Sequence, residues 1–222
     1  MKYIFSDKPI KTASAAIIDV IKKHILNDER VLWLLSGGSS AAIAVEVSKK
    51  LTGLDLSKLF VSMTDERYGD VGHKDENWQQ LLDAGLILPR ATLYRPLKSQ
   101  NIYNTTTDFN KWLSIQLKKA DYKIGIFGIG ADGHTAGIKP HSPAVESPNL
   151  ATSFTGDDFK RITITFNTIR QFNEIFIQAS GTGKRSAIDN LLHKNISLDD
   201  QPAQILKQVP IATIYTNNKE IL

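Results

Sequence analysis

Short runs of apolar residues recur along the chain at the length of β-strands. Several runs are continuous rather than alternating, a pattern typical of strands that are covered on both faces of a sheet. These runs cover residues 2–6, 31–35, 59–63, 123–127, 162–166, 175–179 and 211–215. The pattern therefore predicts a sheet whose strands lie inside the protein.

Between these runs, apolar residues recur at the spacing of one helix face. The clearest case is residues 9–26, where the apolar stripe consists of Ile10, Ala13, Ile17, Val20 and Ile21. Further helices are predicted at residues 39–51, 107–119 and 184–193. Alternating strands and helices favour a layered α/β fold with a mostly parallel sheet. In such folds, functional groups gather where strands end and the following helices begin.

The alternation continues on both sides of a proline-rich segment, KPHSPAVESPN at residues 139–149. Its three prolines are typical of a surface loop rather than of a domain boundary. The chain has 222 residues, of which 41% are hydrophobic, and is long enough to bury a substantial core. We therefore expect one domain that spans residues 1–222.

The composition of the chain indicates the cellular compartment in which the protein is expected. The absence of cysteine excludes disulfides, thiolate catalysis and cysteine-bound zinc, and fits a reducing compartment. The N-terminal segment lacks the apolar core of a signal peptide, and no apolar run approaches the roughly 20 residues that span a bilayer. We expect a soluble, cytoplasmic protein with no membrane partner.

The net charge of +4 is modest, and the lysines are scattered along the chain. A nucleic-acid surface would more often concentrate its basic residues in one stripe. The charge balance therefore predicts a small anionic substrate and no nucleic-acid partner.

Two strand ends in the first half carry polar groups. In LLSGGSSAAIA (residues 34–44), Gly37-Gly38 leads into a predicted helix, where free N–H groups can hold a phosphate. The same residues are also compatible with an ordinary turn in which a serine caps the helix. In VSMTDERYG (residues 61–69), three ionisable residues either face a substrate or form a solvated salt-bridge cluster. They are Asp65, Glu66 and Arg67.

The stretch GIGADGHTAGIKP (residues 128–140) satisfies G-x-G-x-x-G, the dinucleotide-binding fingerprint, and follows a predicted strand. Gly137, Pro140 and Pro143 come too soon for the helix that such a fingerprint requires. No acidic residue ends the next strand, where the sequence reads NLATSF. A nicotinamide cofactor is therefore not expected.

The same stretch places Asp132 two residues before His134. A carboxylate that holds one ring nitrogen leaves the other free to take a proton from water near neutral pH, which suits hydrolysis. Alternatively, Asp132 forms an Asx-type turn and His134 caps a short helix.

In IQASGTGKRSAI (residues 177–188), two glycines precede Lys184 at a predicted helix start. Gln178 occupies the first glycine position of a P-loop and Arg185 follows the lysine, so an ATPase is disfavoured. Lys184 and Arg161, which leads the run RITITF, either bind a substrate phosphate or are ordinary surface cations. The histidines other than His134 are isolated in sequence, so no metal site is predicted. They are His24, His73, His141 and His193.

Taken in order, these segments resemble the motifs of the 6-phosphogluconolactonases, which share a fold with the glucosamine-6-phosphate deaminases. LSGGSS resembles the family's LSGGST turn, TDERYGDVGHKDENW resembles its DER segment, and GIGADGHTAGIKP resembles G-x-G-x-D-G-H-T-A-S-x-F-P. RITITF, GTGK and QPAQIL resemble its later landmarks. The resemblance covers residues 1–217 and implies a three-layer, Rossmann-like fold with a mostly parallel sheet.

The resemblance implies hydrolysis of 6-phospho-D-glucono-1,5-lactone to 6-phospho-D-gluconate in the oxidative branch of the pentose phosphate pathway, without a cofactor. By matching position, the resemblance implies that His134 is the general base and that Asp132 either orients it or contacts the substrate. Arg67 and neighbouring N–H groups are expected to stabilise the oxyanion. The residues expected to hold the phosphate and the sugar are Gly38, Ser39, Ser40, Asp65, Arg161 and Lys184. The expected partner is a small sugar phosphate, and the expected state is a monomer or weak homodimer.

The chain departs from the family pattern at several positions. Ser40-Ala41 replaces threonine-proline, Gly137 and Lys139 replace serine and phenylalanine, and Asn217 or Asn218 replaces an aspartate after the last strand. The related deaminases carry a glutamate before the proline at the position of Lys139, so ring-opening chemistry loses its acid here. A deaminase, or a sugar-phosphate sensor without activity, remains the alternative interpretation.

Overall fold

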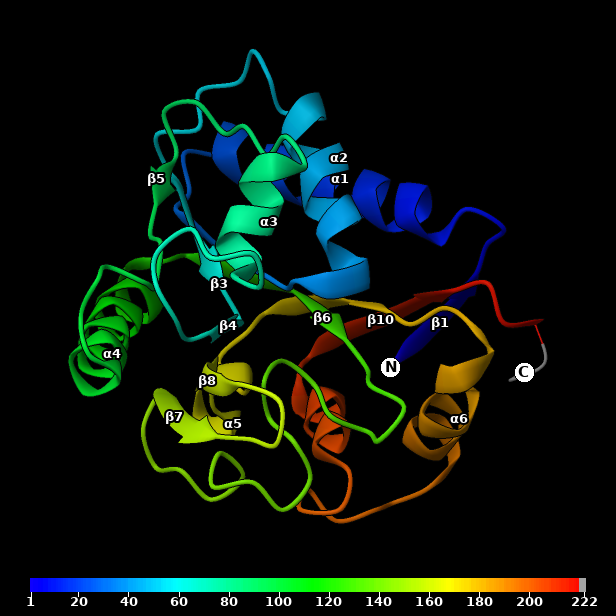
Figure 1. Cartoon of the computed structure of the whole chain (residues 1–222). Helices are drawn as coiled ribbons and strands as arrows, with labels where there is room; N and C mark the ends of the chain where they lie inside the picture. The colour runs from blue at the N-terminus through cyan, green and yellow to red at the C-terminus, as the bar shows by residue number, and fades with distance from the viewer. Residues whose placement is uncertain (220–222) are drawn as a thin grey trace.

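The computed structural model describes residues 1–219 (Figure 1). Its centre is a sheet of seven strands in the order β1-β10-β9-β6-β2-β3-β5, and every neighbouring pair is parallel. The strands are β1 (Lys2–Phe5), β10 (Ile211–Thr216), β9 (Glu174–Gln178), β6 (Tyr122–Gly128), β2 (Val31–Leu35), β3 (Leu59–Met63) and β5 (Thr92–Leu93). The prediction of an α/β fold with a mostly parallel sheet is confirmed.

The order of the strands reverses between β2 and β6. From β2 the chain adds β3 and β5 on one side, and then returns to place β6, β9 and β10 on the other. The loops that leave β2 and β6 therefore diverge and open a crevice at the carboxyl edge of the sheet. Both loops carry predicted site motifs, because β2 ends just before Gly37-Gly38 and β6 ends at Gly128.

Helices cover both faces of the main sheet, so the fold has three layers (Figure 1). The alternation of side chains along β2 shows this: Trp33 packs with α1 and α2, whereas Leu32 and Leu34 belong to the core on the opposite face. One core contains α1 (Pro9–Leu26), α2 (Ala41–Lys50) and α3 (Asn77–Asp83). The other contains α4 (Ile102–Lys119), α5 (Phe166–Ile169) and α6 (Arg185–His193). Among residues 1–219, no helix has the length and apolar character needed to cross a membrane.

A second, small antiparallel sheet lies beside the main one, with strand order β4-β8-β7. Its strands are β4 (Asp65–Arg67), β8 (Lys160–Ile164) and β7 (Ala151–Thr155). The predicted strand at 162–166 is thus shifted to 160–164, and Phe166 starts α5 instead. Pairing with β4 sets this register and places Arg161 opposite Arg67. The small sheet therefore brings two distant arginines together.

Most other predicted elements lie where the pattern placed them. The bounds of α1, β2 and β3 agree with the prediction. Helix α4 begins five residues before the predicted start at 107, because the side chain of Asn101 accepts a hydrogen bond from the Asn104 N–H and caps the helix there. The pattern missed the short elements β4, β5, β7, α3 and α5 and the 3-10 segment Pro202–Gln208.

Candidate active site

A pocket of about 200 Å³ opens at the carboxyl edge, where the crevice between β2 and β6 meets the small sheet. This volume lies below the range of about 300–1,000 Å³ that drug-sized ligands occupy and suits a single monosaccharide. Eight of the nine predicted site residues line it: Gly38, Ser39, Ser40, Asp65, Arg67, His134, Arg161 and Lys184. The ninth, Asp132, contacts His134. The four predicted motifs therefore converge on one pocket.

Asp132 and His134 form a hydrogen-bonded pair at the end of β6. Oδ1 of Asp132 lies 2.5 Å from Nδ1 of His134 and also accepts the His134 backbone N–H at 3.1 Å. The Asx-type turn and the acid–histidine pair are therefore one arrangement and not alternatives. The bond from the His134 ring is the main reason why the pKa of Asp132 falls to about 2. An ionised Asp132 favours the tautomer that carries its proton on Nδ1 and keeps a lone pair on Nε2.

The glycines of this motif seat the pair rather than a cofactor. Gly133 has φ +82°, a left-handed conformation that only glycine adopts readily. At Gly130, a Cβ atom would overlap both the His134 ring and the Asp132 carboxylate. No helix begins between residues 129 and 165, so the interpretation of His134 as a helix cap is wrong, and the dinucleotide fingerprint lacks its helix.

The Gly37-Gly38 turn presents backbone N–H groups at the start of α2. Gly38 has φ +58° and opens a 3-10 turn, Gly38–Ser40, that runs directly into the helix. The alternative of a serine cap is wrong, because the side chain of Ser40 forms no capping hydrogen bond. The hydroxyl of Ser39 instead donates to Oε1 of Gln178 at 3.1 Å and accepts from Nζ of Lys184 at 3.4 Å. The helix end is thus open to an anion beside a lysine.

The DER segment divides its charges between two sides of β4. Asp65 and Arg67 line the pocket, whereas the side chain of Glu66 points the other way and accepts the backbone N–H groups of Asn77 and Trp78 at 2.6 and 2.9 Å. Burial raises the pKa of Glu66 to about 8, and these N–H groups oppose the rise. Asp65 and Glu66 are both buried, so the alternative of a solvated salt-bridge cluster is wrong.

Asn77, at the start of α3, is a pocket residue that sequence reasoning did not single out. Its Nδ2 donates to the backbone carbonyl of Asp65 at 3.0 Å, and its side-chain oxygen occupies the space that a Cβ atom on Gly37 would need. Asn77 therefore clamps the Gly37 turn to β4. No periodicity links it to either partner, so the one available signal was its place in the motif TDERYGDVGHKDENW.

Four cationic side chains line the pocket: Arg67, Lys139, Arg161 and Lys184. Among the pocket-lining residues, Asp65 is the one acid, so the field favours an anionic ligand. Burial lowers the pKa of Lys184. Lys139 stands where the resemblance expects an aromatic ring, and its Nζ lies 3.7 Å from Oδ2 of Asp158. The wall at this position is therefore charged.

Asn217 and Asn218, the neutral residues after the last strand, support the loop that carries Lys184. The side-chain oxygen of Asn217 accepts the Gly181 N–H at 3.4 Å, and Nδ2 of Asn218 donates to the Gly181 carbonyl at 3.2 Å. Gly181 itself has φ +92°. Asn217 supplies an acceptor and Asn218 a donor to the Gly181 turn, and an ionised aspartate at position 218 could not donate.

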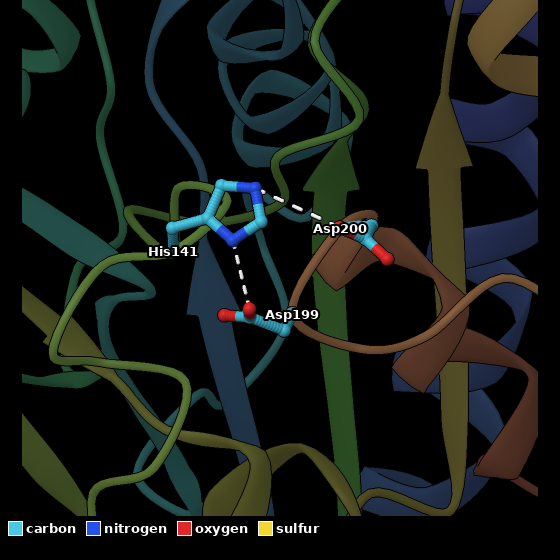
Figure 2. A group of neighbouring side chains, drawn as sticks. All are labelled: His141, Asp199 and Asp200. Carbon is cyan, nitrogen blue, oxygen red and sulfur yellow. Dashed lines mark hydrogen bonds and ion pairs between the residues drawn. The ribbon is translucent and has the colours of Figure 1, made fainter.

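A separate group of titratable side chains lies on the surface (Figure 2). Nδ1 of His141 lies 2.7 Å from Oδ2 of Asp199, and Nε2 lies 3.7 Å from Oδ1 of Asp200. Within residues 1–219, this is the one grouping of three side chains close enough to share a metal ion, and all three are exposed. Both ring nitrogens face carboxylates, an arrangement that suits a protonated imidazole.

We expect His141 to titrate above the ordinary histidine value, because hydrogen bonding to Asp199 raises its pKa. The link therefore stabilises the fold below about pH 6.5, the unfolded value, and is lost as the pH rises through the higher folded-state pKa. Proton NMR of the His141 ring will measure the midpoint, and Asp199→Asn should lower it. A midpoint that Asp199→Asn leaves unchanged would contradict this assignment.

Comparisons with known proteins place the chain among relatives. A family described as glucosamine-6-phosphate isomerases/6-phosphogluconolactonase matches residues 6–220. A 6-phosphogluconolactonase of Helicobacter pylori strain J99 is 28% identical over 209 residues, which cover 89% of this chain and 87% of the relative. A solved 6-phosphogluconolactonase from Thermotoga maritima has a TM-score of 0.83 at 17% identity, covering 97% of this chain and 98% of that one. A solved monomeric glucosamine-6-phosphate deaminase has a TM-score of 0.78 at 17% identity, with coverages of 100% and 98%. The two solved structures carry different activities on a similar fold, so the fold alone does not distinguish the two reactions.

Proposed function

The chain belongs to the glucosamine-6-phosphate isomerase/6-phosphogluconolactonase family, and we propose that it hydrolyses 6-phospho-D-glucono-1,5-lactone to 6-phospho-D-gluconate. The observation that carries this proposal is the Asp132–His134 pair at the edge of a cationic, monosaccharide-sized pocket. The name of the Helicobacter pylori relative supports the same reaction. The reaction is a step of the oxidative branch of the pentose phosphate pathway.

His134 acts as the general base in this proposal. Its Nε2 takes a proton from a water molecule as the water oxygen attacks C1 of the lactone. The carbonyl electrons move to the oxygen, and the guanidinium of Arg67 stabilises the resulting oxyanion. When the adduct collapses, the bond between C1 and the ring oxygen breaks, and His134 returns its proton to that oxygen. The new carboxylic acid then loses a proton to solvent. Asp132 holds the ring and its tautomer throughout.

In this proposal, the phosphate binds at a different part of the pocket from the reacting carbonyl. The N–H groups of Gly38, Ser39 and Ser40 at the start of α2 suit a phosphate, and Arg161 and Lys184 supply the opposing charge. Asp65, buried against the pocket, is suited to accept a hydrogen bond from a sugar hydroxyl. Because a phosphorylated sugar does not cross a bilayer unaided, we propose that the enzyme acts in the cytoplasm.

Deamination of glucosamine 6-phosphate is the second candidate, because a deaminase shares the fold. The family pattern for that reaction requires a glutamate at the position of Lys139. This chain has a cation there, and its charge is paired with Asp158. Lactone hydrolysis needs no acid at that position, so the site favours the lactonase.

The proposal predicts that the protein accelerates the loss of freshly generated 6-phosphogluconolactone above its spontaneous rate. The assay compares lactone decay with and without protein and measures ammonia release from glucosamine 6-phosphate in parallel. Ammonia release without faster loss of the lactone would contradict the lactonase proposal and favour deaminase activity. Tight binding of both sugars without turnover would indicate a sensor.

A further inference from the structure

The tip of the β7–β8 hairpin, residues 156–159, reaches two of the cations that line the pocket. Asp158 is paired with both terminal nitrogens of the Arg161 guanidinium, with Oδ2 2.8 Å from Nη2. The same Oδ2 lies 3.7 Å from Nζ of Lys139. One carboxylate outside the pocket lining therefore engages two cations that belong to it.

This pairing has the geometry that phosphate recognition would use. A guanidinium fork binds a carboxylate and a phosphate in the same two-bond manner, so the two anions compete for one set of donors. The side chain of Arg161 is 8% exposed, whereas that of Asp158 is 43% exposed. The arginine is therefore enclosed by the protein, and the carboxylate is the partner that lies nearer to solvent.

The hairpin tip holds its position through more than one contact. The Gly156 N–H donates to the Phe159 carbonyl at 2.9 Å and closes the turn. The ring centroid of Phe159 lies 5.4 Å from the guanidinium carbons of both Arg67 and Arg161. The tip thus rests on both arginines, and Oδ1 of Asp158 also accepts the Phe159 N–H at 2.9 Å.

We propose that Asp158 is a specificity-determining residue that competes with the ligand's phosphate for Arg161 and Lys139. The proposal deepens the proposed function, because it rests on a pocket that binds a phosphate group. A phosphate monoester carries a charge of about −1.5 to −2 at pH 7, against −1 for a carboxylate. A phosphate can therefore displace Asp158, whereas a singly charged ligand exchanges one carboxylate for another and gains little. Asp158 sets the charge threshold that a ligand must exceed.

The competition predicts that removing the charge of Asp158 strengthens phosphate binding. Inorganic phosphate is titrated calorimetrically into the wild-type protein, Asp158→Asn and Asp157→Asn at constant ionic strength. We expect the Kd of Asp158→Asn to fall about tenfold, because a charge-assisted pair no longer has to be broken. Asp157→Asn is the matched control: it removes the same charge from the same exposed tip, and screening should hold its effect within about twofold.

The sign of the change in the Kd for phosphate distinguishes a competing role of Asp158 from a positioning role. If Asp158 only positions Arg161, Asp158→Asn will bind phosphate as weakly as the wild type or more weakly, which would overturn the proposal. Absence of phosphate binding by the wild-type protein would also overturn it. Asp158→Ser, which removes the carboxylate differently, must shift the Kd in the same direction. Because inorganic phosphate needs no turnover, tighter binding without lactonase activity would refute the proposed function and leave the role of Asp158 intact.

Discussion

Replacing His134 with alanine should lower the kcat of lactone hydrolysis by about 10²- to 10⁴-fold, the usual contribution of a positioned general base. The ring is held by Asp132 at 2.5 Å, and residues 1–219 form no further hydrogen bond to it, so Nε2 is available to take the water proton. The side chain is 37% exposed, and its loss should cost little stability. Lactone decay at saturating substrate, with the spontaneous rate subtracted, measures the effect.

His141→Ala is the matched control for this substitution. His141 lies on the same loop and is also bonded to an aspartate, but it is exposed and does not line the pocket. The kcat of His141→Ala should equal that of the wild type. If His134→Ala folds with an unchanged melting temperature and retains the wild-type kcat, the assignment of His134 as the base fails.

The central sheet and the position of the site were predictable from the sequence because both depend on local signals. Continuous apolar runs mark strands that are buried on both faces, and glycines mark where such strands end. Gly37-Gly38 and Gly128 are examples, and the structure brings their loops to one crevice at the strand-order reversal. Parallel order then places all motif-bearing strand ends at the same edge.

The small sheet was not predictable in the same way. Strand β4 has three residues and β7 reads ATSFT, so neither shows an apolar run or a convincing alternation. Once β4 is known as a strand, its period of two explains why Asp65 and Arg67 share the pocket face while Glu66 turns to α3. The alternation of residue types along β4 is present in the sequence. Which of these residues face the pocket depends on the pairing of β4 with β8, which lies about a hundred residues away.

Contacts between side chains from different loops were the least accessible to sequence reasoning. Asn77 fills the space beside Gly37, and Asp158 pairs with Lys139, and neither spacing corresponds to a helix or strand period. The sequence shows Lys139 where the family pattern has an aromatic residue, but it does not show what the lysine contacts. The structure shows that Nζ of Lys139 lies 3.7 Å from the carboxylate of Asp158 on the hairpin tip.

Replacing Arg161 with methionine should raise the KM for the phosphorylated lactone about 100-fold and leave the kinetics with unphosphorylated glucono-1,5-lactone nearly unchanged. Truncating one partner of a buried, hydrogen-bonded charge pair costs about 2–5 kcal/mol of binding energy, which brackets this value. Arg161 is 7% exposed and has its fork directed at an anion, Asp158, in this structure. Steady-state kinetics with both lactones measure the difference.

Two variants separate the role of the charge from that of the fork. Arg161→Lys keeps a cation but loses the two-bond geometry, so its KM should fall between those of the wild type and Arg161→Met. Arg170→Met removes an exposed arginine outside the pocket and should leave the KM for both lactones unchanged. If Arg161→Met slowed both lactones equally, Arg161 would act on the fold or on the reacting carbonyl, and the phosphate would have to be held by the other pocket cations and the α2 N-terminus.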